Sequence, residues 1–344
     1  MRAVVYRGVN DLRLETVPVP RTGANELLVK VAVCGVCPTD IKKIHHGTVP
    51  PPRIFGHETA GTIVRAGARV RGFRVGDRVA LHHHVPCLDC HACRHRAFAQ
   101  CAQYKRTGIT AGFEPAGGGY AEYVRVMSFC LPGVVKSPAR NNFLEAAMLE
   151  PVNTVLKAVK RLSLLPGDCV LVAGQGPIGL MFTRLLALQG IKAVASDLLE
   201  PRLALARQFG AAQAWRGDRE NFAAQVMRLT RGRGLDAVVR EALELARGAG
   251  QVLLFAHTRR GAVTGLDLSK VCVDEKDLIG SYSADITLQR RVAQIVFSGK
   301  LDVRRLISHA FPLEQTAAAV ALASNPTPDS LKVVVDHTVC DASS

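Results

Sequence analysis

The sequence has few aromatic residues and no long hydrophobic run. Aromatic side chains make up 5% of its 344 residues, and there is one tryptophan. The longest uncharged run, residues 169–183, contains three glycines and a proline, so it is too short and too interrupted to span a bilayer. The N-terminal residues enter an alternating, strand-like pattern without the apolar stretch of a secretion signal. We therefore expect a cytoplasmic protein with no membrane partner.

Acidic residues are scarce relative to basic ones. The sequence has 29 Asp and Glu residues and 44 Lys and Arg residues, which gives a net charge of +15. Such an excess raises the question of a nucleic-acid partner. The sequence contains neither basic residues interleaved with aromatic ones nor a nucleic-acid recognition motif. We expect no nucleic-acid partner and attribute the charge to the surface.

The composition and the pattern of the chain predict two domains. Hydrophobic residues make up 48% and charged residues 21%, as in globular proteins of this length. Residues 1 to about 130 contain short alternating runs that predict a β-rich barrel. From about 141, predicted helices alternate with buried strands, which is typical of a doubly wound sheet. The predicted strands of this second part are 169–173, 192–196, 236–239, 251–255 and 278–280, and a final strand at 332–336 is expected to return to the first domain.

A glycine-rich turn follows the predicted strand 169–173 and opens a helix. The first glycine of such a turn permits a tight bend, the second lets a pyrophosphate approach the backbone, and the third lets helix and strand pack closely. A second strand then ends at an acidic residue, which completes a dinucleotide-binding fingerprint. We expect the cofactor to contact Gly174, Gly176, Pro177, Ile178, Gly179, Asp197 and Arg202.

The acidic residue of this fingerprint bears on the choice of cofactor. Asp197 can accept hydrogen bonds from the adenosine ribose, and its charge would repel a 2′-phosphate. This favours NAD over NADP, whereas Arg202, five residues further on, argues in the opposite direction.

Four of the ten cysteines lie close together, at positions 87, 90, 93 and 101. Because disulfides are unusual in a reducing compartment, the crowding of Cys87, Cys90, Cys93 and Cys101 indicates a metal site. Four thiolates close a tetrahedral shell, which favours a structural zinc ion. An iron–sulfur cluster and a nucleic-acid-binding zinc ribbon are the alternatives, but a ferredoxin-type run would place its fourth cysteine after three residues and before a proline.

A second set of candidate ligands is dispersed along the chain. Cys37, His57, Glu58 and Glu150 are of the residue types that hold a catalytic zinc ion with a position open to substrate. Each also has an ordinary interpretation, as a small buried residue, a core histidine or a helix-end carboxylate. Spacing alone does not assemble them. The run His82 to His84 is more simply a strand end that leads into the cysteine-rich segment.

Together these motifs resemble the zinc-dependent medium-chain dehydrogenases of the alcohol dehydrogenase superfamily, closest to the polyol (sorbitol or iditol) and threonine dehydrogenase branch. The resemblance implies an α/β plus β fold. A GroES-like barrel would comprise residues 1–150 and 285–344, and a Rossmann domain residues 151–284. It also implies NAD, two zinc ions per chain, one catalytic and one structural, and a homo-oligomer, either a dimer or a tetramer.

The resemblance also assigns roles to individual residues. Cys37 and His57 would hold the catalytic zinc, and Glu58 would be a third ligand or one that exchanges with water. Glu150 stands where alcohol dehydrogenases have a cysteine and polyol dehydrogenases a glutamate.

Three further residues acquire roles in the same way. Thr39 would relay the alcohol proton, His46 would end the relay, and Thr154 would touch the nicotinamide. The implied reaction is hydride transfer from a secondary alcohol, a polyol or sugar alcohol, to NAD+. The alternatives are a threonine-type β-hydroxy amino acid or general alcohol dehydrogenase and, in another class, a non-catalytic protein that binds NAD and zinc.

One segment departs from the family pattern. Only 11 residues, 240–250, separate the predicted strands 236–239 and 251–255, which is at the lower limit for a crossover between parallel strands. Relatives usually have about a dozen more. Either the sequence omits a loop, or the cofactor domain is trimmed and binds NAD poorly.

Overall fold

The computed structural model describes residues 1–82, 85–105, 117–218, 220–239, 243–255, 263 and 265–339. The chain forms two compact units. The first comprises Met1–Asn153 and Ala284–Ser344, and the second comprises Thr154–Ser283. We call them the β-rich unit and the cofactor unit.

The β-rich unit is built on a sheet with the strand order β14-β15-β3-β4-β5-β7, in which β6 also pairs with β3. A separate antiparallel pair is formed by β1 and β2. The strands are β1 (Arg2–Gly8), β2 (Asp11–Thr16), β3 (Leu27–Gly35), β4 (Glu58–Ala66), β5 (Arg78–Leu81), β6 (Tyr123–Val126), β7 (Val135–Lys136), β14 (Ile307–Phe311) and β15 (Lys332–Asp336). The helices are α1 (Pro38–His46), α2 (His91–Arg94), α3 (Ala102–Lys105), α4 (Phe143–Ala147), α10 (Gln289–Phe297) and α11 (Thr316–Ser324), and α5 (Leu149–Val159) runs from this unit into the next. Short 3-10 helices lie at Phe98–Gln100, Ser128–Gly133, Ile286–Leu288, Val303–Leu306 and Leu313–Gln315.

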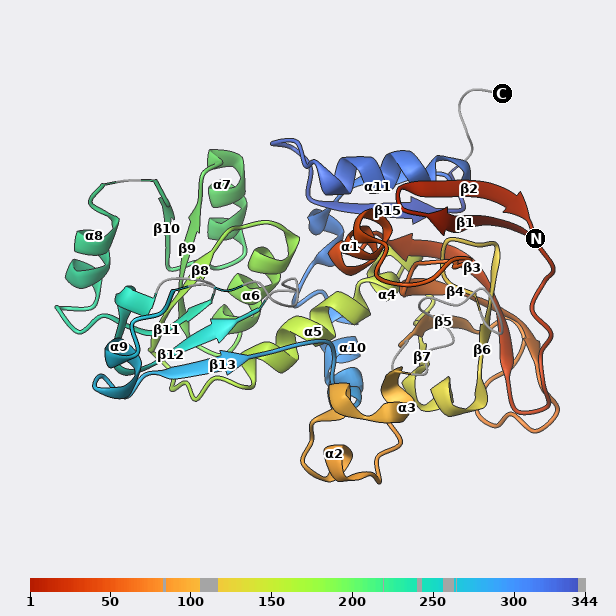
Figure 1. The fold of residues 1–344 in the computed structure, drawn as a ribbon, viewed down its shortest axis with the longest axis horizontal. Helices are drawn as coiled ribbons and strands as arrows, with labels where there is room; N and C mark the ends of the chain where they lie inside the picture. The colour runs from red at the N-terminus through yellow and green to blue at the C-terminus, as the bar shows by residue number, and fades with distance from the viewer. Residues whose placement is uncertain are drawn as a thin grey trace. The chain divides into compact units, whose positions relative to one another are not determined.

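Strand β3 is the centre of this sheet. It pairs antiparallel with β4, β6 and β15, and every residue except Lys30 is buried. A strand surrounded by neighbours must be apolar over nearly its whole length, as Leu27–Gly35 is. The pairing with β15 places the predicted last strand beside β3 (Figure 1).

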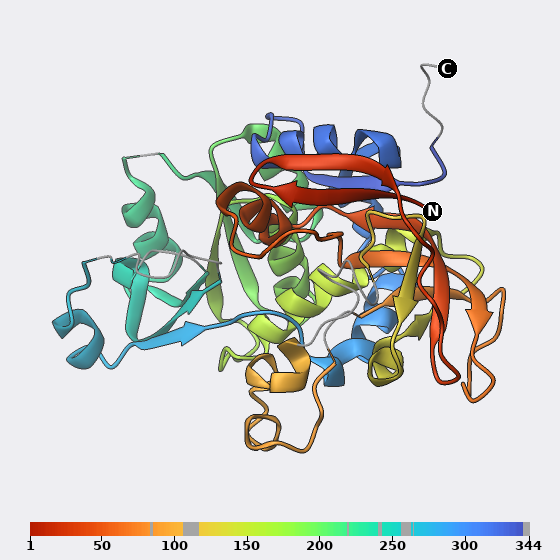
Figure 2. The ribbon, with the colours of Figure 1, turned by 45° about the vertical axis from the view of Figure 1, so that its right-hand side comes forward.

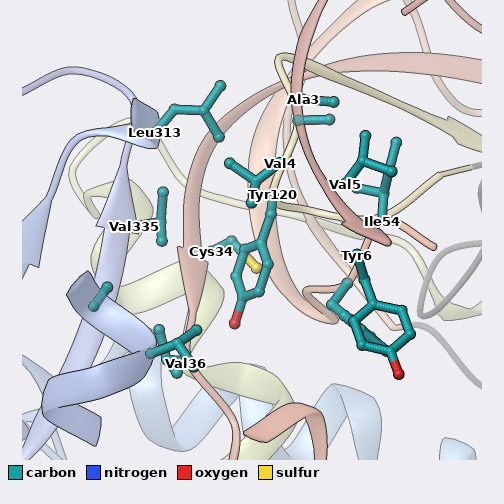
Figure 3. Close-up of a cluster of buried hydrophobic side chains, with 14 of the residues drawn as sticks. Ala3, Val4, Val5, Tyr6, Cys34, Val36, Ile54, Tyr120, Leu313 and Val335 are labelled. Carbon is teal, nitrogen blue, oxygen red and sulfur yellow. The ribbon is translucent and has the colours of Figure 1, made fainter. Parts of the chain in front are cut away.

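A cluster of buried side chains packs against the end of β3. It joins β1 residues with Cys34 and Tyr120 (Figure 3). Phe55 belongs to the same cluster. The rings of Tyr6 and Phe55 meet edge to face, with their centroids 5.3 Å apart. Cys34, three residues before Cys37, is fully buried in this core.

The cofactor unit is a parallel sheet with the order β10-β9-β8-β11-β12-β13 (Figure 2). Its first strand is central and the chain winds outward in both directions, which is the Rossmann strand order. The elements are β8 (Cys169–Ala173), α6 (Pro177–Ala187), β9 (Lys192–Asp197), α7 (Glu200–Gln208), β10 (Gln213–Arg216), α8 (Phe222–Leu229), β11 (Leu235–Val239), a 3-10 helix (Leu243–Leu245), β12 (Ala246–Leu254), α9 (Ser269–Cys272) and β13 (Asp277–Gly280).

The connection between β11 and β12 is shorter than the sequence suggested. Strand β12 begins at Ala246 instead of Gln251, so residues 240–245 connect two parallel strands. Of these, 240–242 lie outside the described residues, and 243–245 form the 3-10 helix. Six residues are fewer than the roughly 10 to 12 that a crossover with an α-helix needs.

Across the described ranges, no helix is both long enough and apolar enough to cross a membrane.

An ion pair joins β6 to the loop before β3. Arg125 donates to both carboxylate oxygens of Glu26, at 2.8 and 2.6 Å, and the Gly23 N–H donates to Oε2 at 2.6 Å. Burial acts to raise the pKa of Glu26, but these hydrogen bonds outweigh it and hold the pKa below its ordinary value. The ionised carboxylate therefore stabilises the fold above the ordinary pKa, and this contribution is lost as the pH falls through the lowered one.

We predict that Glu26→Gln lowers the free energy of unfolding at pH 7 by about 1–3 kcal/mol, because it replaces two charge-assisted hydrogen bonds from Arg125 with weaker ones to a neutral amide. Denaturant unfolding from pH 7 to pH 3 should show this difference shrinking as the natural carboxylate protonates. Glu15→Gln is the matched control, because the Arg7–Glu15 pair has the same two-bond geometry in a more exposed place and should change stability by less than about 1 kcal/mol. Equal effects of the two substitutions would contradict the prediction.

Candidate metal and cofactor sites

Cys37 lies where β3 gives way to α1. It is the N-cap of that helix, and its Sγ accepts a hydrogen bond from the Thr39 N–H at 3.5 Å. Pro38 follows in the first helical position, where its missing N–H costs nothing. The local sequence therefore begins a helix here and places the sulfur at its N-terminus.

Three of the predicted ligands come together in the β-rich unit. The candidate ligand atoms of Cys37, His57 and Glu58 lie within 4.8 Å of one another. The antiparallel register sets Gly35 opposite Glu58, so the end of β3 and the start of β4 carry the ligands to one place. A thiolate, an imidazole and a carboxylate at this spacing fit a zinc ion. We call Cys37, His57 and Glu58 the catalytic cluster.

Asp40 orients the histidine of this cluster. His57 Nδ1 lies 3.0 Å from Asp40 Oδ2, which also accepts the Gly56 N–H at 3.2 Å. Both side chains are buried, and burial alone would lower the pKa of His57, but the charges of Asp40 and Cys37 raise it well above its ordinary value. A carboxylate on Nδ1 leaves Nε2 as the atom for a metal. In the absence of metal the same charges stabilise a proton on the ring, so metal binding should release that proton.

Glu150 is buried at the start of α5, and it is close enough to the cluster for the charges of His57 and Glu58 to affect its pKa. Burial raises the pKa of Glu150 to about 7; His57 acts to lower it and Glu58 to raise it. Within the described residues, the group of ligand atoms within 4.8 Å contains Cys37, His57 and Glu58 but not Glu150. Glu150 is thus a nearby carboxyl group and is not part of the three-residue cluster.

A buried lysine completes the surroundings of the cluster. Lys332, the first residue of β15, forms an ion pair with Glu58 Oε2, and its Nζ donates to the Val36 carbonyl at 2.9 Å. Both charged side chains are over nine-tenths buried. Burial by itself would lower the pKa of Lys332, but Glu58, Cys37 and Glu150 raise it, so the ammonium stays charged.

The residues predicted for the proton relay lie along α1. Thr39 is half-buried in the first turn, two residues from Cys37. His46 ends the helix and is exposed, roughly 13 Å along the axis from its start. Thr154, which was predicted to touch the nicotinamide and not to relay the proton, lies apart from these residues in the sequence, in α5, and is half-buried. The structure therefore places Thr39, but not His46, beside the catalytic cluster.

The four clustered cysteines form a second candidate metal site around α2 and α3. Sulfur separations are 3.5 Å for Cys90–Cys93, 3.6 Å for Cys101–Cys87 and 3.9 Å for Cys87–Cys93. Four ligands about 2.3 Å from a zinc ion lie about 3.8 Å from one another, so these sulfurs fit a tetrahedral shell. Burial opposes ionisation of Cys101, but the N–H groups of Cys87 and Tyr104 lower its pKa to about 6. Of the neighbouring histidines, His82 is buried, and His83 and His84 lie outside the described residues.

The glycine-rich turn in the cofactor unit has the geometry of a phosphate cradle. Gly174 has a φ of 81°, which makes the tight bend. A side chain on Gly179 would lie 1.8 Å from the Gly174 carbonyl, so only glycine lets the helix approach the turn. Gly176 caps α6 without a side-chain hydrogen bond, and a Cβ there would meet no atom within 4 Å. Pro177 and Ile178 start the helix, and the open N-terminus suits an anion.

Asp197 ends β9 beside this turn. Its two carboxylate oxygens accept the N–H groups of Gln175, at 2.6 Å, and Leu199, at 3.0 Å. These bonds hold the carboxylate at the strand end, where each oxygen retains a lone pair for a ribose hydroxyl. Arg202 is half-buried in the first turn of α7.

Two residues of the catalytic site were missed by sequence reasoning. Asp40 stands three residues after Cys37, and the sequence offered as a signal only an acidic residue shortly after Pro38, which often begins a helix. Lys332 had no such signal, because its role depends on the pairing of β15 with β3.

Comparison with known families matches both units. The family model for the alcohol dehydrogenase GroES-like domain matches residues 23–136. The family model for zinc-binding dehydrogenases matches residues 177–297.

Individual relatives match almost the whole chain. Sorbitol dehydrogenase of Bombyx mori is 30% identical over 94% of this chain and 95% of its own length. D-arabinitol dehydrogenase 1 of Uromyces fabae is 29% identical over 93% of each chain. Among solved structures, a zinc-binding dehydrogenase from Sinorhizobium meliloti 1021 bound to NADP superimposes with a TM-score of 0.87, at 26% identity and over 97% of this chain and 98% of that chain.

We predict that Cys101→Ser removes one zinc ion per chain and lowers the melting temperature, because three thiolates no longer close the shell. Metal analysis by mass spectrometry and a thermal melt would measure both. Cys272→Ser is the control, since this cysteine is exposed on α9. An unchanged metal content in Cys101→Ser would rule out the four-cysteine site.

Proposed function

Because the chain belongs to the zinc-dependent medium-chain dehydrogenases of the alcohol dehydrogenase superfamily, in its polyol branch, we propose that it oxidises a secondary hydroxyl group of a polyol with NAD+. The products are a ketone, NADH and a proton.

The observation that carries this proposal is the catalytic cluster. A thiolate, an imidazole and a carboxylate within 4.8 Å of one another are a ligand set for zinc, and the set lacks a fourth protein ligand among the described residues. Catalytic zinc sites keep such a position open, whereas structural sites are closed. The four-cysteine site provides the contrast within the same chain.

Each residue of this site has a separate task. When bound, zinc supplies Lewis-acid chemistry that makes an alcohol hydroxyl more acidic. Cys37, His57 and Glu58 would hold the ion, and Asp40 fixes the ring orientation of His57. Thr39 lies two residues after Cys37, in the first turn of α1. Its hydroxyl group would take the alcohol proton. A nicotinamide cofactor, held through the turn Gly174–Gly179, would supply the acceptor for a hydride from the substrate carbon.

Two observations support a polyol as substrate. The relatives that match the whole chain include a sorbitol and a D-arabinitol dehydrogenase. Glu150, a carboxyl group next to the cluster, makes the surroundings of the metal harder and more hydrophilic than a cysteine would. A hydroxyl-rich substrate is compatible with that environment.

The preference for NAD rests on Asp197. Its carboxylate lies at the end of β9, where it would bind ribose hydroxyls and repel a 2′-phosphate. A structure of similar fold, the zinc-binding dehydrogenase from Sinorhizobium meliloti 1021, is bound to NADP, so the fold alone does not select the cofactor.

We predict that Cys37→Ser abolishes polyol oxidation and leaves NADH binding unchanged, because the metal ligand and the dinucleotide turn belong to different units. NADH formation at 340 nm with sorbitol and a panel of other secondary alcohols measures the first effect, and calorimetric titration with NADH the second. Cys272→Ser should keep full activity. Turnover by Cys37→Ser at the natural rate would refute the proposed function.

We further predict that Asp197→Asn shifts the ratio of kcat/KM for NAD over NADP toward NADP by about tenfold, because it removes the charge that repels the 2′-phosphate. Steady-state kinetics with both cofactors provide the ratio. Asp218→Asn, an exposed acid of the same unit paired with Arg216, should leave it unchanged. An unaltered ratio in Asp197→Asn would show that this carboxylate does not select the cofactor.

A further inference from the structure

The catalytic cluster combines buried or half-buried groups that can be anionic with a buried lysine. Cys37, Glu58, Asp40 and Glu150 can each carry a negative charge. The cation is Lys332, whose ammonium acts electrostatically on Glu58, Cys37 and Glu150. Burying this many like charges is unfavourable unless cations balance them. A zinc ion would supply two positive charges and Lys332 a third.

The contacts of Lys332 are specific. Its Nζ pairs with Oε2 of Glu58, the first residue of β4, and also donates to the carbonyl of Val36, which directly follows β3. Two partners from separate segments therefore fix its position. Gly35 provides the space, because a Cβ on Gly35 would lie 1.8 Å from Glu58 Oε2 and 3.0 Å from Lys332 Cε. The ammonium therefore engages one defined oxygen of a residue that is also a candidate metal ligand.

We propose that Lys332 is a positioning residue. By binding Oε2 of Glu58, it weakens the coordination of the catalytic zinc by Glu58. Glu58 is thereby shared between an ammonium and the metal, and the metal stays open to the substrate. This inference rests on the proposed function, since it assumes that the catalytic cluster holds zinc.

Two simpler roles for Lys332 make different predictions. If it only neutralises charge, removing it strengthens zinc binding whether or not Glu58 is a carboxylate, because the site becomes more negative. If it only ties β15 to β3, removing it destabilises the unit and weakens zinc binding. If it acts through Glu58, removing it strengthens zinc binding only while Glu58 is present. A double-mutant cycle separates the three cases.

The experiment measures zinc release to an excess of chelator in the full-length, zinc-loaded protein. The variants are Lys332→Met, Glu58→Gln and the double variant, and Lys332→Arg is the conservative control. A Cys37→Ser sample identifies the release phase that belongs to the catalytic cluster. Lys332→Gln, which keeps an N–H for the Val36 carbonyl, replaces Lys332→Met if the latter does not fold by circular dichroism.

We expect Lys332→Met to slow the Cys37-dependent release by about tenfold or more, the size of effect typical of residues that contact metal ligands. In the Glu58→Gln background the same change should alter release by less than about twofold, and Lys332→Arg should stay close to the natural rate. Faster release from Lys332→Met, or equal slowing in both backgrounds, overturns the inference. The absence of any Cys37-dependent phase in the natural protein would instead refute the catalytic metal site itself.

Discussion

The antiparallel pairing of β3 with both β4 and β15 is the constraint on which the catalytic cluster depends. Register along β3 sets Gly35 opposite Glu58 on one side and opposite Val334 on the other. Cys37 follows β3 directly and caps α1. A slip of one residue in either pairing would turn Glu58 or Lys332 to the opposite face of the sheet. The buried core around Cys34 and Tyr120 prevents such a slip, because it would expose apolar side chains (Figure 3).

Electrostatics determines how this site differs from the four-cysteine site. The catalytic cluster is surrounded by buried charges of both signs, with Asp40 on His57 and Lys332 on Glu58. The four cysteines are held by their own backbone, where N–H groups of Cys87 and Cys90 point at sulfur atoms. A site of sulfurs and backbone donors is complete by itself, which suits a structural ion. In the catalytic cluster the ligands also interact with charged neighbouring side chains, which can weaken their coordination of the metal. Such coordination leaves room for a substrate at the metal, as a catalytic site requires.

Much of the fold could be predicted from the sequence because its signals are local. The strand at 169–173, the glycine turn and the helix after it are set by neighbouring residues, and the structure has them at β8 and α6. The β11–β12 connection could not be predicted in the same way. Strand β12 begins at Ala246 because parallel pairing with β11 extends across an irregularity in the register, and pairing between strands leaves no pattern in a single stretch of sequence.

The sequence by itself determined the chemistry that is available. It supplied four cysteines at metal-binding spacing, the glycines and acid of a dinucleotide turn, and a cysteine, a histidine and a glutamate of the types that bind zinc. Only the tertiary structure decided which of these meet. It placed Cys37 near His57 and Glu58 and left His46 at the far end of α1. It also brought Lys332, in the last strand β15, to the carboxylate of Glu58 in β4. The physical reason is that β-sheet pairing brings together residues that are far apart in the chain. A buried ion pair between two strands can therefore form only after both strands have paired within the sheet.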